Sequence, residues 1–414
     1  MGLVGPRHAH RCFAQAYRWA LDLAGAAAVR SYQGLTGALV TWTAQLLPAL
    51  QARLRQRMQE CGGDHWRLGR WLALAVDGSR VSAPRTAANE RAFCAPRYGH
   101  GQTAKYRKKK GARRRRRGKP EPVKPQVWTT LVWHLGLRLP WGWKTGPSYA
   151  GERDHWRALL AEGHFPKDTL FCAGAGFTGY ELWKALADAG HSFVIRVGGN
   201  VTLRRRLGYA RERAGVVYCW PDKAARKRQP PLVLRLWRLQ VGRCPMALVT
   251  NVLDERQLSA ADVRELYRRR WGIELQFRAL KQTFGRRKLR SKTPDRALVE
   301  LDWSLVGLWL AQLFAVKEQL PLGEPPARSS AALALRILRE LLDRRHEPAD
   351  PGADLGRRLQ EATTDAYRRR TSKKARYRPK YKDKPAAGTP KVVTAQPYHK
   401  VLLREYLQAT KRIP

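Results

Sequence analysis

The chain has 414 residues, of which 43% are hydrophobic, so it can bury one large core or two modest ones and is not disordered throughout. Lys and Arg number 80 against 33 Asp and Glu, which gives a formal net charge of +47. Such an excess is extreme for an enzyme of small metabolites. It favours a polyanionic partner, and nucleic acid above all, because each neutralised phosphate releases condensed counterions.

Neither the cysteines nor the apolar segments indicate export or a membrane. The six cysteines, at positions 12, 61, 94, 172, 219 and 244, form no C-x-x-C pair, so we expect neither a zinc knuckle nor a disulfide framework. The apolar run from Leu305 to Val316 is interrupted by Gln312 and is too short to span a bilayer. It predicts a buried core helix. The N-terminus lacks an uninterrupted apolar stretch, and we expect a cytoplasmic bacterial protein with no membrane partner.

Taken in chain order, the patterns predict an α/β (α+β) protein with six segments. These are a helical N-terminal region that is one candidate for DNA binding (1–66), a first core part (67–199) with a flexible basic loop at about 100–122, a β-rich insertion (200–255), a second core part (256–292), a helical C-terminal region (293–348) and a basic tail (349–414). Within the basic loop, residues 105–119 hold eleven Lys or Arg in fifteen positions. Mutual repulsion predicts a solvated tract that either stays disordered or orders on a DNA backbone.

The first core part begins with an apolar strand, LALAVDGSR, that places Asp77 at its end. A predicted hairpin at 127–145 and a helix at 151–163 follow, with Glu152 and Asp154 in the first turn of that helix. The next strand, TLFCA, leads into Gly174, Gly176 and Gly179 in the spacing G-x-G-x-x-G. This spacing is also that of a dinucleotide-binding loop, but alone it is a weak signal.

A long predicted helix from Ser259 to about Phe284 carries a polar stripe. Tyr267, Arg270, Glu274 and Lys281 stand at offsets that fall within about 60° of one another on a helical wheel of roughly 100° per residue. One interpretation is an amphipathic basic helix with an incidental ion pair. The other is a metal-dependent phosphoryl-transfer site, in which the carboxylate holds Mg²⁺ and the cations hold the scissile strand. Further cations on this helix include Arg268 and Arg278.

The stripe resembles a known signature. YRRRWGIELQFRALK matches Y-(2)-R-(3)-E-(6)-K, the pattern around the last acid of DDE transposases of the insertion sequence 4 family, at every fixed position. That family is also similar in placing a first Asp at the end of a core strand, as Asp77 stands here, and the resemblance extends from about Trp71 to Phe284. It implies a ribonuclease H-like mixed sheet flanked by helices, and cut-and-paste DNA strand cleavage and transfer with two divalent metals, Mg²⁺ or Mn²⁺.

By the same resemblance, Asp77 and Glu274 are metal ligands, while Tyr267, Arg270 and Lys281, with Arg268 and Arg278, contact DNA. The partners implied are double-stranded transposon-end and target DNA, bound by a homodimer in the nucleoid. Related transposases stack a flipped base on an aromatic residue of the β-rich insertion. Here we expect Trp220 and Trp237 to be core residues instead.

The chain departs from the family at the second acid, because Gly174 stands where the family carries Asp. Asp168 lies at the other end of the strand, roughly 20 Å away at about 3.3 Å per residue, and Glu181 lies in the following helix, so neither replaces the missing acid. We therefore expect one of the two metal positions to be lost and strand cleavage to be impaired or absent, with DNA binding retained.

Three alternatives remain open. A non-catalytic DNA-binding derivative, such as a repressor of related copies, keeps the basic surfaces and does not need Asp at 174. A nuclease that does not transpose has the same residues. A dinucleotide-binding oxidoreductase explains the three glycines, and Arg196 suits a 2′-phosphate, but the acid expected at the end of the next strand is missing.

Overall fold

The computed structural model describes residues 31–94, 124–241, 244–343, 355–364 and 388–411. The predicted basic loop at about 100–122, the first 30 residues and residues 365–387 of the predicted basic tail lie outside the described residues. The first described element is α2 (Tyr32–Gly62), which begins where the Ser31 side chain accepts a hydrogen bond from the Gly34 N–H at 3.0 Å. This helix falls within the segment predicted to be a helical N-terminal region.

The described strands form a single ten-stranded sheet. They are β1 (Leu72–Ser82), β2 (Gln126–His134), β3 (Leu139–Pro147), β4 (Thr169–Ala173), β5 (Ser192–Val197), β6 (Thr202–Arg205), β7 (Val216–Cys219), β8 (Leu232–Val241), β9 (Cys244–Thr250) and β10 (Lys391–Thr394). Their order across the sheet is β10-β6-β7-β8-β9-β5-β4-β1-β2-β3. β1, β2 and β3 form an antiparallel meander, whereas β4 and β5 run parallel to β1. This is the ribonuclease H-like mixed sheet with flanking helices that the sequence predicted.

β1 is a central strand whose sequence explains its position. It lies between β2 and β4, and it is buried from Leu72 to Val76, as expected for a strand covered on both faces. From Asp77 to Ser79 the strand is only half-buried. The predicted strand end at Asp77 is wrong, because β1 continues beside β2 as far as Ser82; Asp77 is the residue at which the strand becomes partly exposed.

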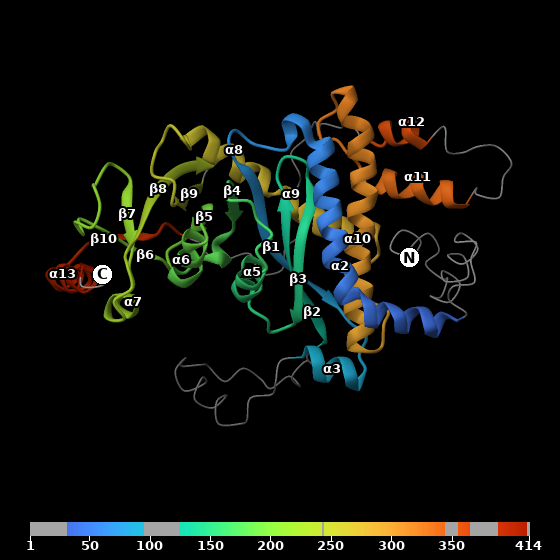
Figure 1. Cartoon of the computed structure of the whole chain (residues 1–414), viewed down its shortest axis with the longest axis horizontal. Helices are drawn as coiled ribbons and strands as arrows, with labels where there is room; N and C mark the ends of the chain where they lie inside the picture. Colours follow the sequence, from blue (N-terminus) through green and yellow to red (C-terminus); the bar gives the residue numbers. More distant parts are fainter. Residues whose placement is uncertain (1–30, 95–123, 242–243, 344–354, 365–387, 412–414) are drawn as a thin grey trace.

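Helices cover the two faces of the core sheet. α5 (Glu152–Ala161) and α6 (Tyr180–Asp188) lie in front of it in Figure 1, and α8 (Ala260–Arg270) and α9 (Gly272–Arg278) lie behind. α8 begins with a capping box, in which Ser259 and Asp262 exchange hydrogen bonds. The predicted long helix is interrupted at Trp271, continues as α9 and ends in a π-helical turn, η3 (Ala279–Thr283).

The segment after β4 does not have the architecture of a dinucleotide loop. Gly174 leads into a short 3₁₀ turn, η2 (Ala175–Phe177), and α6 begins only at Tyr180. The sheet is also mixed rather than parallel, since β1 pairs with β2 in antiparallel register. Neither feature supports the oxidoreductase alternative.

The β-rich insertion continues the core sheet, because β9 pairs with β5 in antiparallel register. Its Trp220 is buried and donates a hydrogen bond to the Gln229 carbonyl at 2.9 Å, and Trp237 packs partly buried against the core. The first of the two predicted core tryptophans is thus fully enclosed. A helical turn, α7 (Asp222–Arg226), occupies the segment between β7 and β8.

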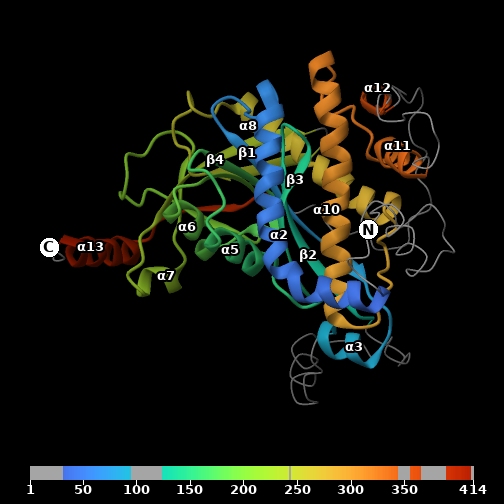
Figure 2. The same ribbon diagram turned by 45° about the vertical axis from the view of Figure 1, so that its right-hand side comes forward.

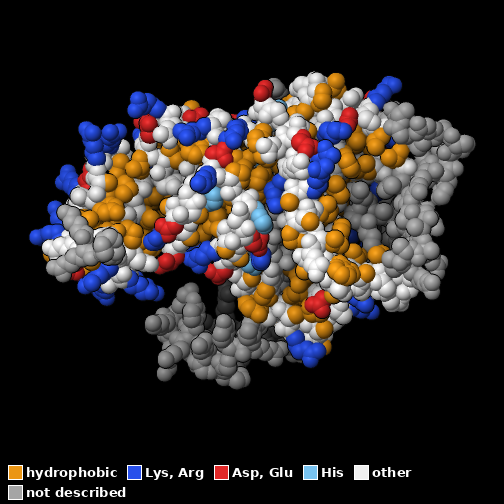
Figure 3. Space-filling view, viewed as in Figure 1, with side chains coloured by type: hydrophobic (Ala, Val, Ile, Leu, Met, Phe, Trp, Pro, Cys, Tyr) orange, Lys and Arg blue, Asp and Glu red, His pale blue; other side chains and the backbone are white. Residues whose placement is uncertain are grey.

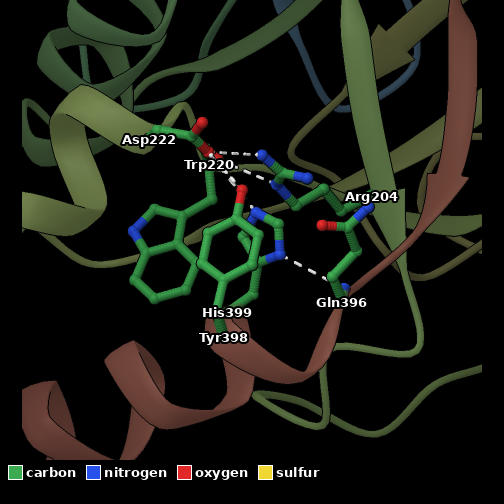
Figure 4. Close-up of polar contacts among 6 residues, drawn as sticks. All are labelled: Arg204, Trp220, Asp222, Gln396, Tyr398 and His399. Carbon is green, nitrogen blue, oxygen red and sulfur yellow. Dashed lines mark hydrogen bonds and ion pairs between the residues drawn. The ribbon is translucent and has the colours of Figure 1, made fainter.

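The last described residues fold back onto the insertion. β10 pairs in parallel register with β6, and α13 (Pro397–Lys411) contacts α7. Figure 4 shows the contact: Asp222 of α7 receives Arg204 Nη2 at 2.7 Å and Tyr398 Oη at 3.3 Å, with His399 Nε2 at 3.4 Å. These elements belong to the stretch interpreted from sequence as a basic tail. Its described part is folded.

The predicted apolar core helix is α10 (Pro294–Gln319). It lies beside α2 in both Figures 1 and 2, and it also contacts α11 (Ala331–Asp343) and α12 (Leu355–Gln360). The stretch Pro294–Leu322 is long and apolar enough to cross a membrane by length and composition alone, but 67% of its most apolar window is buried inside the protein. It is accounted for as the core helix of the C-terminal region.

Candidate active site around Asp77 of strand β1

The site is built around Asp77, where β1 leaves the core. One carboxylate oxygen of Asp77, Oδ1, accepts a hydrogen bond from the Gly78 N–H at 2.8 Å. The other, Oδ2, lies 3.4 Å from Arg270 Nη1 of α8. The Asp77 side chain keeps 28% of its surface exposed. It is therefore held on one side and open on the other.

Arg270 joins the two acids that the sequence proposed as metal ligands. Its Nη2 lies 3.7 Å from Glu274 Oε1 of α9, while its Nη1 faces Asp77. The guanidinium is 5.1 Å from the centre of the Tyr267 ring and is almost wholly buried. Three members of the predicted stripe and the first Asp thus converge at one place.

The site disfavours negative charge in the absence of a cation. Burial raises the pKa of Asp77 against the opposing effects of the Gly78 N–H and the Arg270 charge. Burial also raises the pKa of Glu274, and the negative charge of Asp77 adds to that effect while Arg270 opposes it. Two carboxylates whose ionised forms are destabilised by burial and by each other are suited to a positively charged ligand.

Lys281 extends the site along the same strand. Its Nζ donates a hydrogen bond to Ser79 Oγ at 2.6 Å, two residues beyond Asp77. Lys281 lies in the π-helical turn η3, which alters the helical spacing at this point. All four residues of the predicted stripe are consequently placed against β1 or against one another.

Gly174 is adjacent to Asp77. The parallel register of β1 and β4 pairs Val76 with Ala173, the last residue of β4, so Asp77 and Gly174 each directly follow a residue of the last pair. A Cβ added at Gly174 meets no atom within 4 Å. Position 174 is therefore a neighbour of the first acid with open space in front of it, whereas Asp168 is at the opposite end of β4, paired with Arg67.

The two additional cations lie apart from this cluster. Arg268 is 71% exposed and forms an ion pair with Glu265 at 2.7 Å, and Arg278 is exposed on α9. Arg268 does line a cleft of about 420 Å³ beside Glu274, together with Arg138, Arg269 and Trp271. The proximity of Arg268 and Arg269, added to burial, lowers the pKa of Arg138. This cleft gathers three guanidinium groups next to one acid.

Within the described residues, no group of three or more His, Cys, Asp or Glu side chains is gathered closely enough to hold a metal ion. The donors around Asp77 are nevertheless of the right type, since carboxylate oxygens are the ligands that Mg²⁺ and Mn²⁺ prefer. The open space at Gly174 shows that the surroundings are not closed around the two acids.

Sequence reasoning did not identify three charged residues near the site. The charge of Arg196 on β5 opposes the raised pKa of the Tyr267 hydroxyl. Arg138 adopts φ 60° in the β2–β3 turn and lines the cleft. The negative charge of Asp77 raises the pKa of Glu152 on α5. Arg196 was considered only as a 2′-phosphate ligand. A signal for Glu152 existed in its place at the start of a helix that follows a core hairpin.

Comparison with known proteins identifies the family. The transposase DDE domain matches residues 72–310, more than half of the chain, so the chain belongs to the transposase DDE domain family. This range contains Asp77, Gly174 and Glu274.

The relatives are distant. The chain is 27% identical over 173 residues to the putative transposase y4zB of Sinorhizobium fredii (strain NBRC 101917 / NGR234), a match that covers 41% of this chain and 48% of that one. It thus spans about half the length of that relative. Among solved structures, a piggyBac transposase synaptic complex with hairpin DNA is similar over 72% of this chain and 58% of the other, with 12% identity and a TM-score of 0.38.

Proposed function

We propose that this protein is a transposase of the insertion sequence 4 type, which binds the ends of its element as double-stranded DNA and whose strand cleavage is weakened by Gly174. The observation that carries this proposal is the placement of Arg270 between Asp77 and Glu274, where the middle of β1 becomes partly exposed. Arg270 and Glu274, which the sequence places on one helical segment, lie beside Asp77 of a strand that is distant in the sequence.

The roles follow from the positions of the side chains. Asp77 and Glu274 would hold Mg²⁺ or Mn²⁺, which supplies activation of a water or 3′-hydroxyl and stabilisation of the leaving oxygen. Arg270 and Lys281, with Tyr267 beneath the guanidinium, position the phosphate of the scissile strand along β1. Arg268, Arg138 and Arg269 in the adjoining cleft hold the flanking backbone, and Arg278 contacts DNA at the outer surface of α9.

Charge elsewhere supports a DNA partner. Figure 3 shows Lys and Arg side chains gathered over the end of the molecule formed by the insertion and α13. With a net charge of +47, the chain would bind terminal inverted repeats and target DNA with a strong dependence on salt. A homodimer in the DNA complex and a location at the nucleoid belong to the same proposal.

A cleavage assay on a matched end sequence with Mg²⁺ or Mn²⁺ tests the proposal. The unmodified chain should bind the end DNA and cleave it slowly, and Gly174→Asp should raise the cleavage rate, because the added side chain enters open space beside Asp77. Robust cleavage that Gly174→Asp leaves unchanged contradicts the role of position 174. Absence of any preference for end DNA over random DNA contradicts the transposase function.

Gly174 itself favours a second candidate, a non-catalytic DNA-binding derivative that represses related copies. It keeps the DNA-contacting cations and needs no second acid. Competition for end DNA with an intact copy separates the two: a repressor blocks cleavage by the intact copy and contributes none, even when a divalent metal is abundant.

A further inference from the structure

The first turn of α5 is fixed against the strands of the candidate site. His155 Nδ1 lies 3.1 Å from Thr130 Oγ1 of β2, and Arg153 Nε donates a hydrogen bond to the Gly176 carbonyl at 3.1 Å. Thr130 is the register partner of Gly78 on β1, next to Asp77. These contacts hold Glu152, the first residue of α5, between β1 and the turn that follows β4.

Two glycines make room for the Glu152 carboxylate. A Cβ added at Gly78 would lie 2.8 Å from Glu152 Oε1, and a Cβ added at Gly176 would lie 3.1 Å from Glu152 Oε2. The carboxylate therefore occupies the space that side chains at 78 and 176 would fill. Gly78 follows Asp77 and Gly176 follows the Gly174 position by two residues, so Glu152 is placed at the gap in the site.

The charges around Glu152 connect it with Asp77. Burial raises the pKa of Glu152, and the negative charge of Asp77 raises it further, while Arg80 and Arg153 oppose the shift. Asp77 contacts Arg270 of α8, and Glu152 lies against Gly78, the residue next to Asp77, from the α5 side. Both carboxylates therefore flank the same stretch of β1.

Arg270 adds an unsatisfied group beside the acids. Its side chain is only 7% exposed, and its Nε has no hydrogen-bond partner among the described residues, although both terminal nitrogens face acids. An N–H donor needs an acceptor and does not bind a cation, so this group suits a phosphate oxygen and not a metal. A cation here would meet the carboxylates alone, with Glu152 in the space at Gly78 and Gly176.

We propose that Glu152 supplies the third carboxylate of the metal site, in place of the acid missing at position 174. This inference rests on the proposed function. Repulsion keeps the Glu152 and Asp77 carboxylates apart while no cation is bound, and a divalent cation draws the flexible Glu152 side chain toward Asp77. The chain then retains metal binding in spite of Gly174, while the different origin of the carboxylate leaves cleavage slower than with Asp at 174.

Mn²⁺ binding to the full chain, measured by electron paramagnetic resonance of the free ion, tests this without any cleavage. Glu152→Gln should weaken Mn²⁺ binding by about tenfold or more, since even residues one shell outside a metal cost about 10–100-fold. Asp154→Asn is the matched control: it removes one negative charge from the same helical turn, from a side chain that is 74% exposed and paired with Arg157, and should leave binding unchanged.

Two further comparisons separate a ligand from a structural residue. Gly174→Asp should restore Mn²⁺ binding to the Glu152→Gln chain, which a merely structural role for Glu152 does not predict. Gly176→Ala should weaken binding, because the new Cβ meets the Glu152 carboxylate, whereas Gly174→Ala, which meets no atom within 4 Å, should not.

The outcomes distinguish this inference from the proposed function. If Asp77→Asn weakens Mn²⁺ binding and Glu152→Gln does not, the inference is wrong and the proposed function stands. If neither substitution changes Mn²⁺ binding, or the unmodified chain binds no Mn²⁺, both are wrong. Loss on both substitutions, with rescue by Gly174→Asp, supports both.

Discussion

Asp222 and Asp77 each form an ion pair with an arginine, but they differ in their other partners and in the direction in which their pKa is shifted. Asp222, in the outer half of the sheet, is 2.7 Å from Arg204 and also receives Tyr398 and His399, and these partners lower its pKa although burial alone would raise it. Asp77, in the core half, is 3.4 Å from Arg270, and burial prevails to raise its pKa.

Under the proposed function, the difference separates a carboxylate that stabilises the fold from one that is available to bind a metal. The Asp222 carboxylate is contacted by side chains from two elements, β6 and α13, so its ionised form is stable without a further ligand. Asp77 is left with a long ion pair and one backbone hydrogen bond, which keeps it available. A partly exposed acid whose ionised form is poorly stabilised by its neighbours is typical of functional sites.

The largest expected difference between Asp77 and Asp222 is in strand cleavage, measured after each acid is neutralised in turn. Asp77→Asn should reduce residual cleavage by more than the roughly 10–100-fold that follows loss of an outer-shell partner of a metal. Its melting temperature should be unchanged or slightly higher, because the neutral amide avoids the burial of a charge. Asp222→Asn should leave cleavage on end DNA nearly unaffected. Equal loss in both variants would contradict the distinction.

Gly272→Ala tests whether the core half depends on close seating of α9 against β2. A Cβ at Gly272 would lie 2.1 Å from the Trp133 ring, so the helix or the ring must move. We expect a loss of about 1–3 kcal/mol in unfolding free energy, as for overpacked cores, together with weaker DNA cleavage because Glu274 is displaced. Denaturant unfolding measures the first. Gly37→Ala, in α2 with no atom within 4 Å of the added Cβ, is the control.

Asp222→Asn also tests whether Asp222 has a structural role at the contact with α13. It removes the shared acceptor of Arg204, Tyr398 and His399, so the docking of α13 should loosen. We expect at most about 1 kcal/mol of local stability to be lost, since the Asp222 side chain is 48% exposed. Hydrogen exchange should quicken in residues 391–411 and stay unchanged in β1. Faster exchange in β1 as well would show that the two halves are not independent.

The smallest effect is a pH dependence of the same contact. Burial and the Arg204 charge lower the pKa of His399 below its usual 6.5, so the folded segment binds a proton less readily than the unfolded one. Stability from this group is therefore full above 6.5 and falls as pH drops below that value. The protection factors of the β10 and α13 amides, which are corrected for the slower intrinsic exchange at low pH, should be smaller at pH 5.5 than at pH 7.5. His399→Gln should abolish that difference.

The parts that local patterns determine were predictable. The strand before Asp77 is a continuous apolar run, as expected for a strand buried on both faces, and the stripe of Tyr267, Arg270, Glu274 and Lys281 follows the helical period of 3.6 residues. The adjacency of Gly174 and Asp77 followed from the resemblance. The parallel register of β4 and β1 independently places Gly174 near Asp77.

The remaining features depend on tertiary packing. Glu152 lies at the site only because α5 packs over Gly78 and Gly176, two residues that contribute no side chain and hence no pattern. The pairing of β10 with β6 joins residues nearly two hundred positions apart, and its short strand, KVVT, has no turn signal that would fix a partner. The interruption at Trp271 arises where Gly272 fits beneath Trp133.

The pairing of β10 with β6 also sets an order of events during synthesis. β6 leaves the ribosome almost two hundred residues before the strand that covers its edge, so a row of unpaired backbone donors and acceptors stays open until the chain is nearly finished. Copies shortened before residue 391 would keep that edge exposed permanently. Such fragments would expose a strand edge that can pair with other chains. Aggregation would then prevent them from competing with full-length copies for DNA.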